Sequence, residues 1–362
     1  MSAGRSEYME WAKTRSQARF NLASSGVAAF PIAELPVAPG DLELTGPSFY
    51  GYPPLQERLA RKAGVAETSV LAATGTSMAN FLVMAALLEP GDEVLIEQPT
   101  YELLTDAARF LRLDIRRFPR RAEDGFRLDP DAVAVAVTPR TRLVVVTNLH
   151  NPSNAFTDDA TLGRLGEIAR GTGARVLVDE VYLEAFVVHG RPARSAFHLG
   201  PEFVTTSSLT KAYGLGGLRC GWALADPDLV TRMWRLRDLM DVVPAHPAER
   251  LSVVALDHID TVAAHARRIL ETNRATVNGF FESRTDLAAT PVDAGMITFP
   301  RLARGDVDAL AAILRERFET TVVPGRFFGM PDRFRLALGC LPETLDEGLT
   351  RLGTALDALA GR

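Results

Sequence analysis

The sequence has 362 residues, of which 47% are hydrophobic and 23% are charged, and its net charge is −5. This length predicts about two domains, and the absence of a basic tract argues against nucleic acid or an anionic membrane as a partner. Two cysteines exclude a disulfide framework, and six scattered histidines indicate no metal site. Because the first 20 residues are polar and lack the apolar core of a signal peptide, we expect a cytoplasmic protein.

Helix and strand patterns alternate along the chain from about residue 53, after a stretch rich in Gly, Pro and Ser at 20–52. Apolar residues at helical spacing predict a helix over 76–89, and the β-branched run at 142–148 is typical of a central parallel strand. Further strands are expected at 93–97, 113–118, 174–180 and 203–208, and further helices at 101–111 and 157–170. This alternation predicts an α/β domain with a parallel sheet.

The pattern changes near residue 225, where long helices replace the alternation. Helices are expected at 226–240, 247–283, 304–318 and 343–360, and strands at 295–300 and 333–339. We therefore expect a large domain of residues 45–240 and a smaller α+β domain, which combines 1–44 with 241–362.

Several polar side chains follow predicted strands, and ligands of an open α/β sheet bind beyond the carboxyl ends of its strands. Thr76 follows Gly75 at the start of a helix, where free N–H groups suit a phosphate, although a threonine there is usually a plain N-cap. Tyr101 follows a strand and a proline, so it either stacks on a flat ligand ring or packs in the core.

Three more polar residues belong to the same pattern. Asn151 could donate a hydrogen bond to a ligand oxygen, or it could only form an Asn-Pro turn. Asp179 ends an apolar strand, where its carboxylate needs a protonated pyridine nitrogen, an arginine or a helix start as its partner. Arg335 lies inside an apolar strand, where it could clamp a substrate carboxylate or join the two domains through a salt bridge.

The most specific segment is TTSSLTKAYGLGGLRCGW at 205–222. A cluster of Ser and Thr precedes Lys211, and Arg219 lies eight residues beyond it. A lysine that forms a Schiff base must be partly neutral near pH 7, so it belongs in a pocket that lowers its pKa. The hydroxyls and Arg219 would complete a phosphate cradle. The chain offers three lysines in all, Lys13, Lys62 and Lys211.

Five segments occur together in the order of one known family: PGDEVLIEQPTY, NLHNPS, DEVY, SLTKAYGLGGLRCGW and VVPGRFFG…RFRLALG. With these segments the chain resembles the class I/II aminotransferases, which are fold-type I enzymes dependent on pyridoxal 5′-phosphate (PLP), over about residues 21–339. The resemblance implies a mainly parallel seven-stranded sheet between helices in the large domain. It also implies PLP as the cofactor and a homodimer with its active site near the subunit interface.

The resemblance gives a role to each matching residue. Lys211 would form the Schiff base and carry the proton, and Asp179 would keep the pyridine nitrogen protonated. Tyr182 and Asn151 would bond the ring O3′, and Tyr101 would stack on the ring. The residues expected to hold the phosphate are Gly75, Thr76, Ser77, Ser208 and Arg219, and those expected at the substrate carboxylate are Arg335 and the region of Gly26.

Two positions depart from the family pattern. Asn154 stands where the family usually has a glycine, and asparagine can adopt the left-handed backbone expected there. Gly46 stands at the place of the tyrosine that reaches the neighbouring subunit's phosphate, and Tyr50 is the candidate substitute. The resemblance also predicts a cis bond between Asn151 and Pro152.

The predicted reaction is the transfer of an amino group from an amino acid to a 2-oxo acid through the Schiff base on Lys211. The alternative is another PLP-dependent reaction on an amino acid, namely decarboxylation, β-elimination or a cyclising lyase reaction, because the sequence does not show which bond at Cα breaks. A third class, transcription regulators with an aminotransferase-like domain, carries a basic DNA-binding domain in front. We do not expect that class, because the resemblance begins by about residue 20.

Overall fold

The structure is a computed structural model that describes residues 4–188, 190, 193–359 and 361. Seven strands form its largest sheet: β2 (Val70–Thr74), β3 (Glu93–Gln98), β4 (Asp114–Pro119), β5 (Thr141–Thr147), β6 (Arg175–Asp179), β7 (Phe203–Ser208) and β8 (Cys220–Leu224). Their order is β2-β8-β7-β6-β5-β3-β4. Neighbouring strands are parallel except at β8, which is antiparallel to β2 and β7. The predicted mainly parallel seven-stranded sheet is therefore confirmed.

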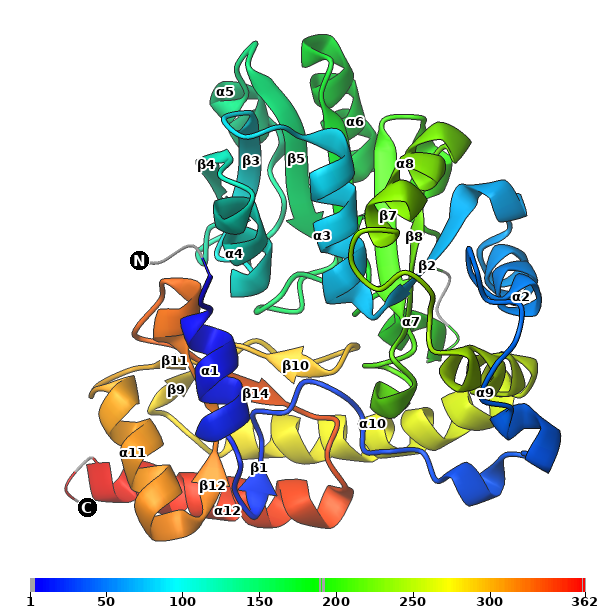
Figure 1. Ribbon diagram of the computed structural model, residues 1–362. Coiled ribbons are helices and arrows are strands. Elements are labelled where there is room, and N and C mark those ends of the chain that lie inside the picture. Colours follow the sequence, from blue (N-terminus) through cyan, green and yellow to red (C-terminus); the bar gives the residue numbers. More distant parts are fainter. Residues whose placement is uncertain (1–3, 189, 191–192, 360, 362) are drawn as a thin grey trace.

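Helices cover both faces of this sheet (Figure 1). The helices on one face are α3 (Thr76–Leu87), α4 (Glu102–Phe110) and α8 (Pro227–Arg237), and those on the other are α5 (Pro130–Ala136) and α6 (Asp159–Thr172). Strand β5 is apolar on both faces because its side chains alternate between the two layers. Leu143 and Val145 pack in the first layer, whereas Val144 and Val146 pack in the second.

The C-terminal part contains small sheets beside long helices. Its three-stranded sheet has the order β10 (Ile297–Thr298), β14 (Phe334–Ala337), β13 (Val323–Pro324), and β9 (Leu287–Ala288) pairs with β11 (Arg301–Leu302). The helices beside these sheets are α10 (Ile259–Glu282), α11 (Val307–Phe318) and α12 (Pro342–Leu359). The N-terminal arm lies against this part: α1 (Glu7–Thr14) leads into β1 (Phe20–Asn21), which pairs in parallel with β12 (Thr320–Thr321) (Figure 1).

Some elements differ from the expectation. Helices α1, α2 (Pro53–Ala63) and α5 and strand β8 were not predicted as elements, and α7 (Glu184–Val188) is a single short turn. The helical stretch expected over 247–283 is divided at His258, where α9 (His246–Asp257) ends and α10 begins. No helix in the described part of the chain is both long and apolar enough to span a membrane. The domain limits near residues 45 and 240 and the cytoplasmic location stay predictions.

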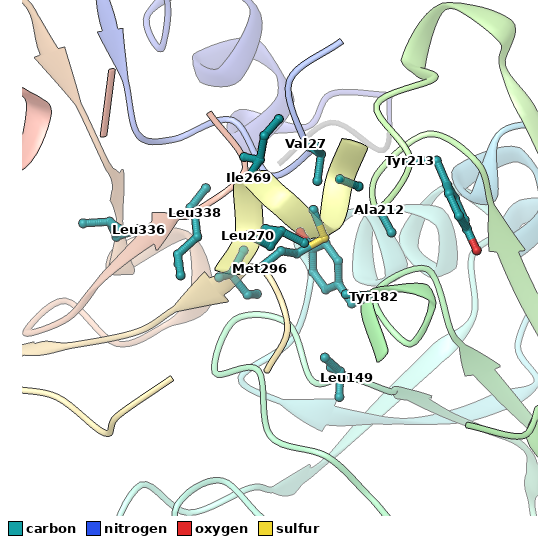
Figure 2. Close-up of a cluster of buried hydrophobic side chains, with 14 of the residues drawn as sticks. Val27, Leu149, Tyr182, Ala212, Tyr213, Ile269, Leu270, Met296, Leu336 and Leu338 are labelled. Atoms are coloured by element: carbon teal, nitrogen blue, oxygen red, sulfur yellow. The ribbon is translucent and has the colours of Figure 1, made fainter. Parts of the chain in front are cut away.

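One buried apolar cluster joins the arm, the strand ends and the C-terminal part. Figure 2 shows Leu149 and Tyr182, which follow strands β5 and β6, on the same side of α10 as Met296. The cluster also contains Val27 from the N-terminal arm and Leu338 from the segment after β14. Segments that are far apart in the sequence are thus fixed to one core behind the carboxyl ends of the central strands.

Candidate active site

A cavity of about 370 Å³ lies at the carboxyl ends of the central strands, where the N-terminal arm forms its opposite wall. It brings together eight of the residues predicted from the sequence: Thr76, Ser77, Tyr101, Asn151, Asp179, Tyr182, Lys211 and Arg219. The arm adds residues that the sequence did not single out, among them Tyr8, Trp11, Asn21 and Ser25. These strand-end residues therefore line one cavity, and their roles in a shared site stay predictions.

Lys211 lies three residues after the end of β7, and its Nζ donates a hydrogen bond to Ser25 Oγ at 3.0 Å. Burial lowers the pKa of Lys211 to about 8, and the nearby guanidinium groups of Arg335 and Arg219 act in the same direction, against Asp179. A lysine with this pKa has a sizeable neutral fraction near neutral pH, so its amine can act as a nucleophile and as a base.

Asp179 is the last residue of β6 and is 4% exposed. Its carboxylate accepts hydrogen bonds from Asn80 Nδ2 at 2.8 Å and from the backbone N–H of Val181 at 3.1 Å. Burial raises the pKa of Asp179, and these hydrogen bonds oppose that effect. Because no arginine or lysine of the described residues forms an ion pair with it, this carboxylate can still take one cationic partner at the cavity.

The turn before α3 is shaped for an anion. Gly75 has φ +82°, and a Cβ at this position would lie 2.3 Å from Nη2 of Arg219. Thr76 begins α3, and its buried Oγ1 has no hydrogen-bond partner in the part of the chain that the structure describes. Free N–H groups at a helix start, an unpartnered hydroxyl and an adjacent guanidinium together fit the phosphate of PLP.

Arg335 lies beneath the cavity on β14 and is 1% exposed. Its guanidinium donates to Asn151 Oδ1 and to Tyr8 Oη, each at 3.0 Å, and to the carbonyl of Ala23 at 3.3 Å. Its Nε has no hydrogen-bond partner among the described residues. No carboxylate of the described residues pairs with it, so the salt bridge considered as its alternative role is not formed within the described chain.

The two tyrosines expected at the cofactor ring are placed by neighbouring elements. Tyr101 is the N-cap of α4, and its ring meets that of Tyr8 edge-on at 5.8 Å between centroids. Tyr182 also lines the cavity and is 2% exposed, and burial raises its pKa, so its hydroxyl stays protonated as a donor.

Three other predicted residues, Ser208, Gly26 and Tyr50, do not line the cavity. Ser208 is fully buried, and its hydroxyl bonds at 2.6 Å to that of Thr210, which does line the cavity. Gly26 follows Ser25 in the arm, where a Cβ added to it would lie 3.5 Å from the carbonyl oxygen of Thr210. Tyr50 lies on the surface, where its hydroxyl contacts Arg235 and Asp238.

Several residues of the site were not predicted from the sequence, and three of them bond to predicted ones. Asn80, which holds Asp179, lies one helical turn after Thr76 on α3, so the i, i+4 spacing could have identified it. Tyr8 and Ser25 lie in the N-terminal arm, and no local signal in the sequence connects them with Arg335 or Lys211.

The two departures from the family pattern have structural explanations. Asn154 has φ +69°, the left-handed conformation expected for it, and its Nδ2 donates to the carbonyl of Ala294 at 2.6 Å. Gly46 lies against the ring of His246, which leaves no room for a side chain in this conformation.

The cis bonds of the described residues are at 98–99 and 148–149, so the expected cis bond at 151–152 is wrong.

Comparison with known proteins agrees with this geometry. The family model described as aminotransferase class I and II matches residues 38–352. Capreomycidine synthase of Streptomyces vinaceus is 33% identical, covering 96% of this chain and 92% of that protein. A PLP-dependent aminotransferase from Streptococcus suis has a TM-score of 0.92 at 26% identity, covering 99% of both chains. The PLP-dependent cyclase OrfR has a TM-score of 0.87 at 28% identity, covering 97% of this chain and 96% of that one.

The family match spans most of the chain, including every strand of the central sheet and every residue of the cavity that follows one of those strands. The residues at the cavity also fit the ring nitrogen and the phosphate of the cofactor that this family uses. The chain therefore belongs to the class I and II aminotransferases, a family of PLP-dependent enzymes.

Proposed function

We propose that this enzyme transfers an amino group from an amino acid to a 2-oxo acid, with Lys211 as the residue that binds PLP covalently and moves the proton. The observation that carries the proposal is the placement of Lys211, with its pKa lowered to about 8, in one cavity with Asp179, a buried carboxylate that lacks a cationic partner among the described residues. Bound PLP supplies an electron sink for the substrate's Cα.

The residues of the chain divide the remaining work. Asp179 would hold a proton at the pyridine nitrogen, and the hydroxyl of Tyr182 and the amide of Asn151 would donate to the ring O3′. Tyr101 would cover the ring. The phosphate would be held by backbone N–H groups at the start of α3, in Gly75, Thr76 and Ser77. The hydroxyl groups nearby are those of Thr76, Ser77, Ser208 and Thr210, and the guanidinium is that of Arg219.

Arg335 would bind the α-carboxylate of the substrate. A buried guanidinium with a free Nε and no carboxylate partner among the described residues is suited to a bidentate contact with an incoming anion. The region of Gly26 would close over that carboxylate, because the arm already contacts Arg335 through the carbonyl of Ala23. With the carboxylate fixed there, the amine of Lys211 would take the proton from Cα.

Another PLP-dependent reaction is the second candidate. Capreomycidine synthase, a relative over almost the full length of both chains, and the cyclase OrfR, a close structural neighbour, carry names other than aminotransferase. A cyclising or eliminating reaction would use the same Lys211 to take the Cα proton and would differ only in the later steps. The arrangement of Lys211, Asp179 and Arg335 serves both reactions.

A half-reaction assay separates the two candidates. The PLP-loaded enzyme is mixed, without a 2-oxo acid, with a panel of amino acids that includes alanine, aspartate, arginine and phenylalanine. An aminotransferase releases one 2-oxo acid per active site and stops, because its cofactor keeps the amino group. Continuous release of ammonia or carbon dioxide, or conversion of the amino acid to a cyclic product without 2-oxo acid, would overturn the proposal in favour of the second candidate.

We also propose that the enzyme is a homodimer. Two surface segments joined by the contact between Tyr50 and Asp238 expose large apolar side chains. Leu44 is 80% exposed and Leu239 is 83% exposed, and Phe49 and Val242 in the same two segments are also exposed. Large exposed apolar side chains on two segments in contact favour a protein partner, and a second copy would bring Tyr50 to the interface, as the family resemblance implies.

Replacing Leu239 with aspartate is expected to convert dimers into monomers, because the interface would have to bury an unpaired carboxylate. The mass in solution, measured by light scattering at several protein concentrations, checks this prediction. Val135→Asp on α5 is the matched control, since Val135 is 87% exposed outside the apolar surface. A wild-type protein that is monomeric at micromolar concentration would contradict the proposal.

A further inference from the structure

Ser25 connects the two sides of the cavity. Its Oγ accepts the hydrogen bond from Lys211 Nζ at 3.0 Å, although 186 residues separate the two in the sequence. The same hydroxyl lies close enough to Tyr182 to oppose the effect of burial, which raises the pKa of that tyrosine. Ser25 is 9% exposed and lines the cavity, so it belongs to the site and not to the outer surface.

The backbone fixes Ser25 from both sides. The N–H of Val27 donates to the carbonyl of Lys211 at 2.8 Å, and the N–H of Ala28 donates to the carbonyl of Gly339 at 2.6 Å. On the other side, Arg335 donates to the carbonyl of Ala23 at 3.3 Å. Val27 is also buried in the core cluster of Figure 2, together with Ala212. The arm therefore holds the hydroxyl at a defined place between the Lys211 loop and the strand of Arg335.

We propose that Ser25 is a positioning residue of the reaction, whose hydroxyl holds the Lys211 amine beside the reacting carbon and links it to the Tyr182 hydroxyl. A lysine side chain has four rotatable bonds, so a released amine needs an acceptor to stay in one place. An ammonium group is a stronger donor than an amine, so the Ser25 oxygen also stabilises Lys211 after it has taken up the Cα proton. The inference rests on the proposed role of Lys211 as proton carrier, and not on the identity of the product.

The charged groups around Lys211 influence its pKa, and this pKa can be used to test the role of Ser25. Arg335 on β14 and Arg219 before β8 lower its pKa, Asp179 at the end of β6 raises it, and burial has the largest effect. Replacing Ser25 with alanine leaves all of these groups in place. It removes an acceptor that favours the protonated form, so the pKa of Lys211 should fall below its wild-type value.

The full-length chain without PLP gives the first measurement. Competitive acylation at a series of pH values, followed by mass spectrometry, reports the pKa of each lysine, and three lysines in the sequence give separate peptides. Ser25→Ala is expected to lower the pKa of Lys211 by about one unit, whereas Ser25→Thr should leave this pKa unchanged. The pKa of Lys13, measured in the same samples, is the internal reference. Ser283→Ala, which removes an exposed hydroxyl at the end of α10, is the matched control.

The PLP-loaded enzyme gives the second measurement. The assay uses the amino acid that reacts fastest in the half-reaction panel and follows by NMR the exchange of its Cα hydrogen for deuterium. The exchange rate reports proton removal by Lys211, whichever product forms. Ser25→Ala should slow the exchange about tenfold to a hundredfold at its own pH optimum, with a change in KM of less than about threefold, and Ser25→Thr should restore it.

A wild-type pKa and a wild-type exchange rate in Ser25→Ala would overturn the inference. A slow variant that threonine does not restore would also overturn it, because the loss would then come from packing. A wild-type enzyme that exchanges the Cα hydrogen but forms no 2-oxo acid overturns the proposed aminotransferase reaction and leaves the role of Ser25 standing.

Discussion

Replacing Lys211 with alanine is expected to abolish turnover, with a loss of about 10⁴-fold or more, and to remove the visible absorbance that PLP has when it is linked to a lysine. Lys211 is the one lysine of the three that lines the cavity, and burial lowers its pKa to about 8, so no other side chain there offers an amine. Absorbance spectra and single-turnover rates with the best amino acid of the panel check both parts of this expectation.

Two further variants make the result specific. Lys211→Arg keeps a positive charge but cannot give up a proton near neutral pH, so it should be as inactive as Lys211→Ala. Lys13→Ala, on the arm outside the cavity lining, should keep the wild-type spectrum and rate. If Lys211→Ala kept the absorbance band and turned over like wild type, Lys211 would not be the residue that binds the cofactor.

The strand ends of the site could be predicted because the sequence marks them locally. The apolar runs that end at Thr147 and Asp179 are buried on both faces of the sheet, and parallel strands present their carboxyl ends at one edge. The polar residues that follow such runs therefore had to lie close together. The Lys211 segment added a specific motif to this geometric argument.

The arm could not be predicted in the same way, because its contacts are not local. The hydrogen bond between Arg335 and Tyr8 joins residues 327 positions apart, and that between Lys211 and Ser25 joins residues 186 apart. Neither pair has a spacing that periodicity can detect, and α1 was not predicted at all. These contacts depend on the pairing of β1 with β12, which places the arm across the cavity.

Strand β8 was missed for a different reason. Its five residues, Cys220–Leu224, follow the glycine-rich turn of the Lys211 segment, and an antiparallel strand there breaks the strand–helix alternation from which the other strands were predicted. A Cβ added to Gly221 on this strand would lie 2.4 Å from the backbone of Gly75. The segment that follows Lys211 thus also packs against the turn before α3, and this second role is visible only in the folded structure.

Asp179→Asn is expected to lower turnover by about a hundredfold to a thousandfold while leaving the fold intact. An asparagine keeps the shape, and its one carbonyl oxygen can accept from the Val181 N–H, which bonds the carboxylate at 3.1 Å. Its NH2 group would face Asn80, which donates to the other carboxylate oxygen at 2.8 Å, and the Asn80 amide can turn over to accept from it because the Thr206 hydroxyl beyond it can donate or accept. It lacks the negative charge that would hold a proton at the pyridine nitrogen, so the cofactor would lose most of its power to withdraw electrons. Single-turnover rates measured with saturating PLP isolate this effect from cofactor affinity.

The stability of the same variant without PLP should change in the opposite direction. Because burial raises the pKa of Asp179 above its unfolded value, keeping it ionised at neutral pH costs stability, and this cost grows as the pH rises through the folded-state pKa. Asp179→Asn removes the cost, so its melting temperature at pH 7 should equal or exceed that of wild type, whereas Asp124→Asn on an exposed loop should change neither stability nor rate. A variant with wild-type turnover would show that Asp179 does not act on the ring nitrogen, since the substitution removes its negative charge.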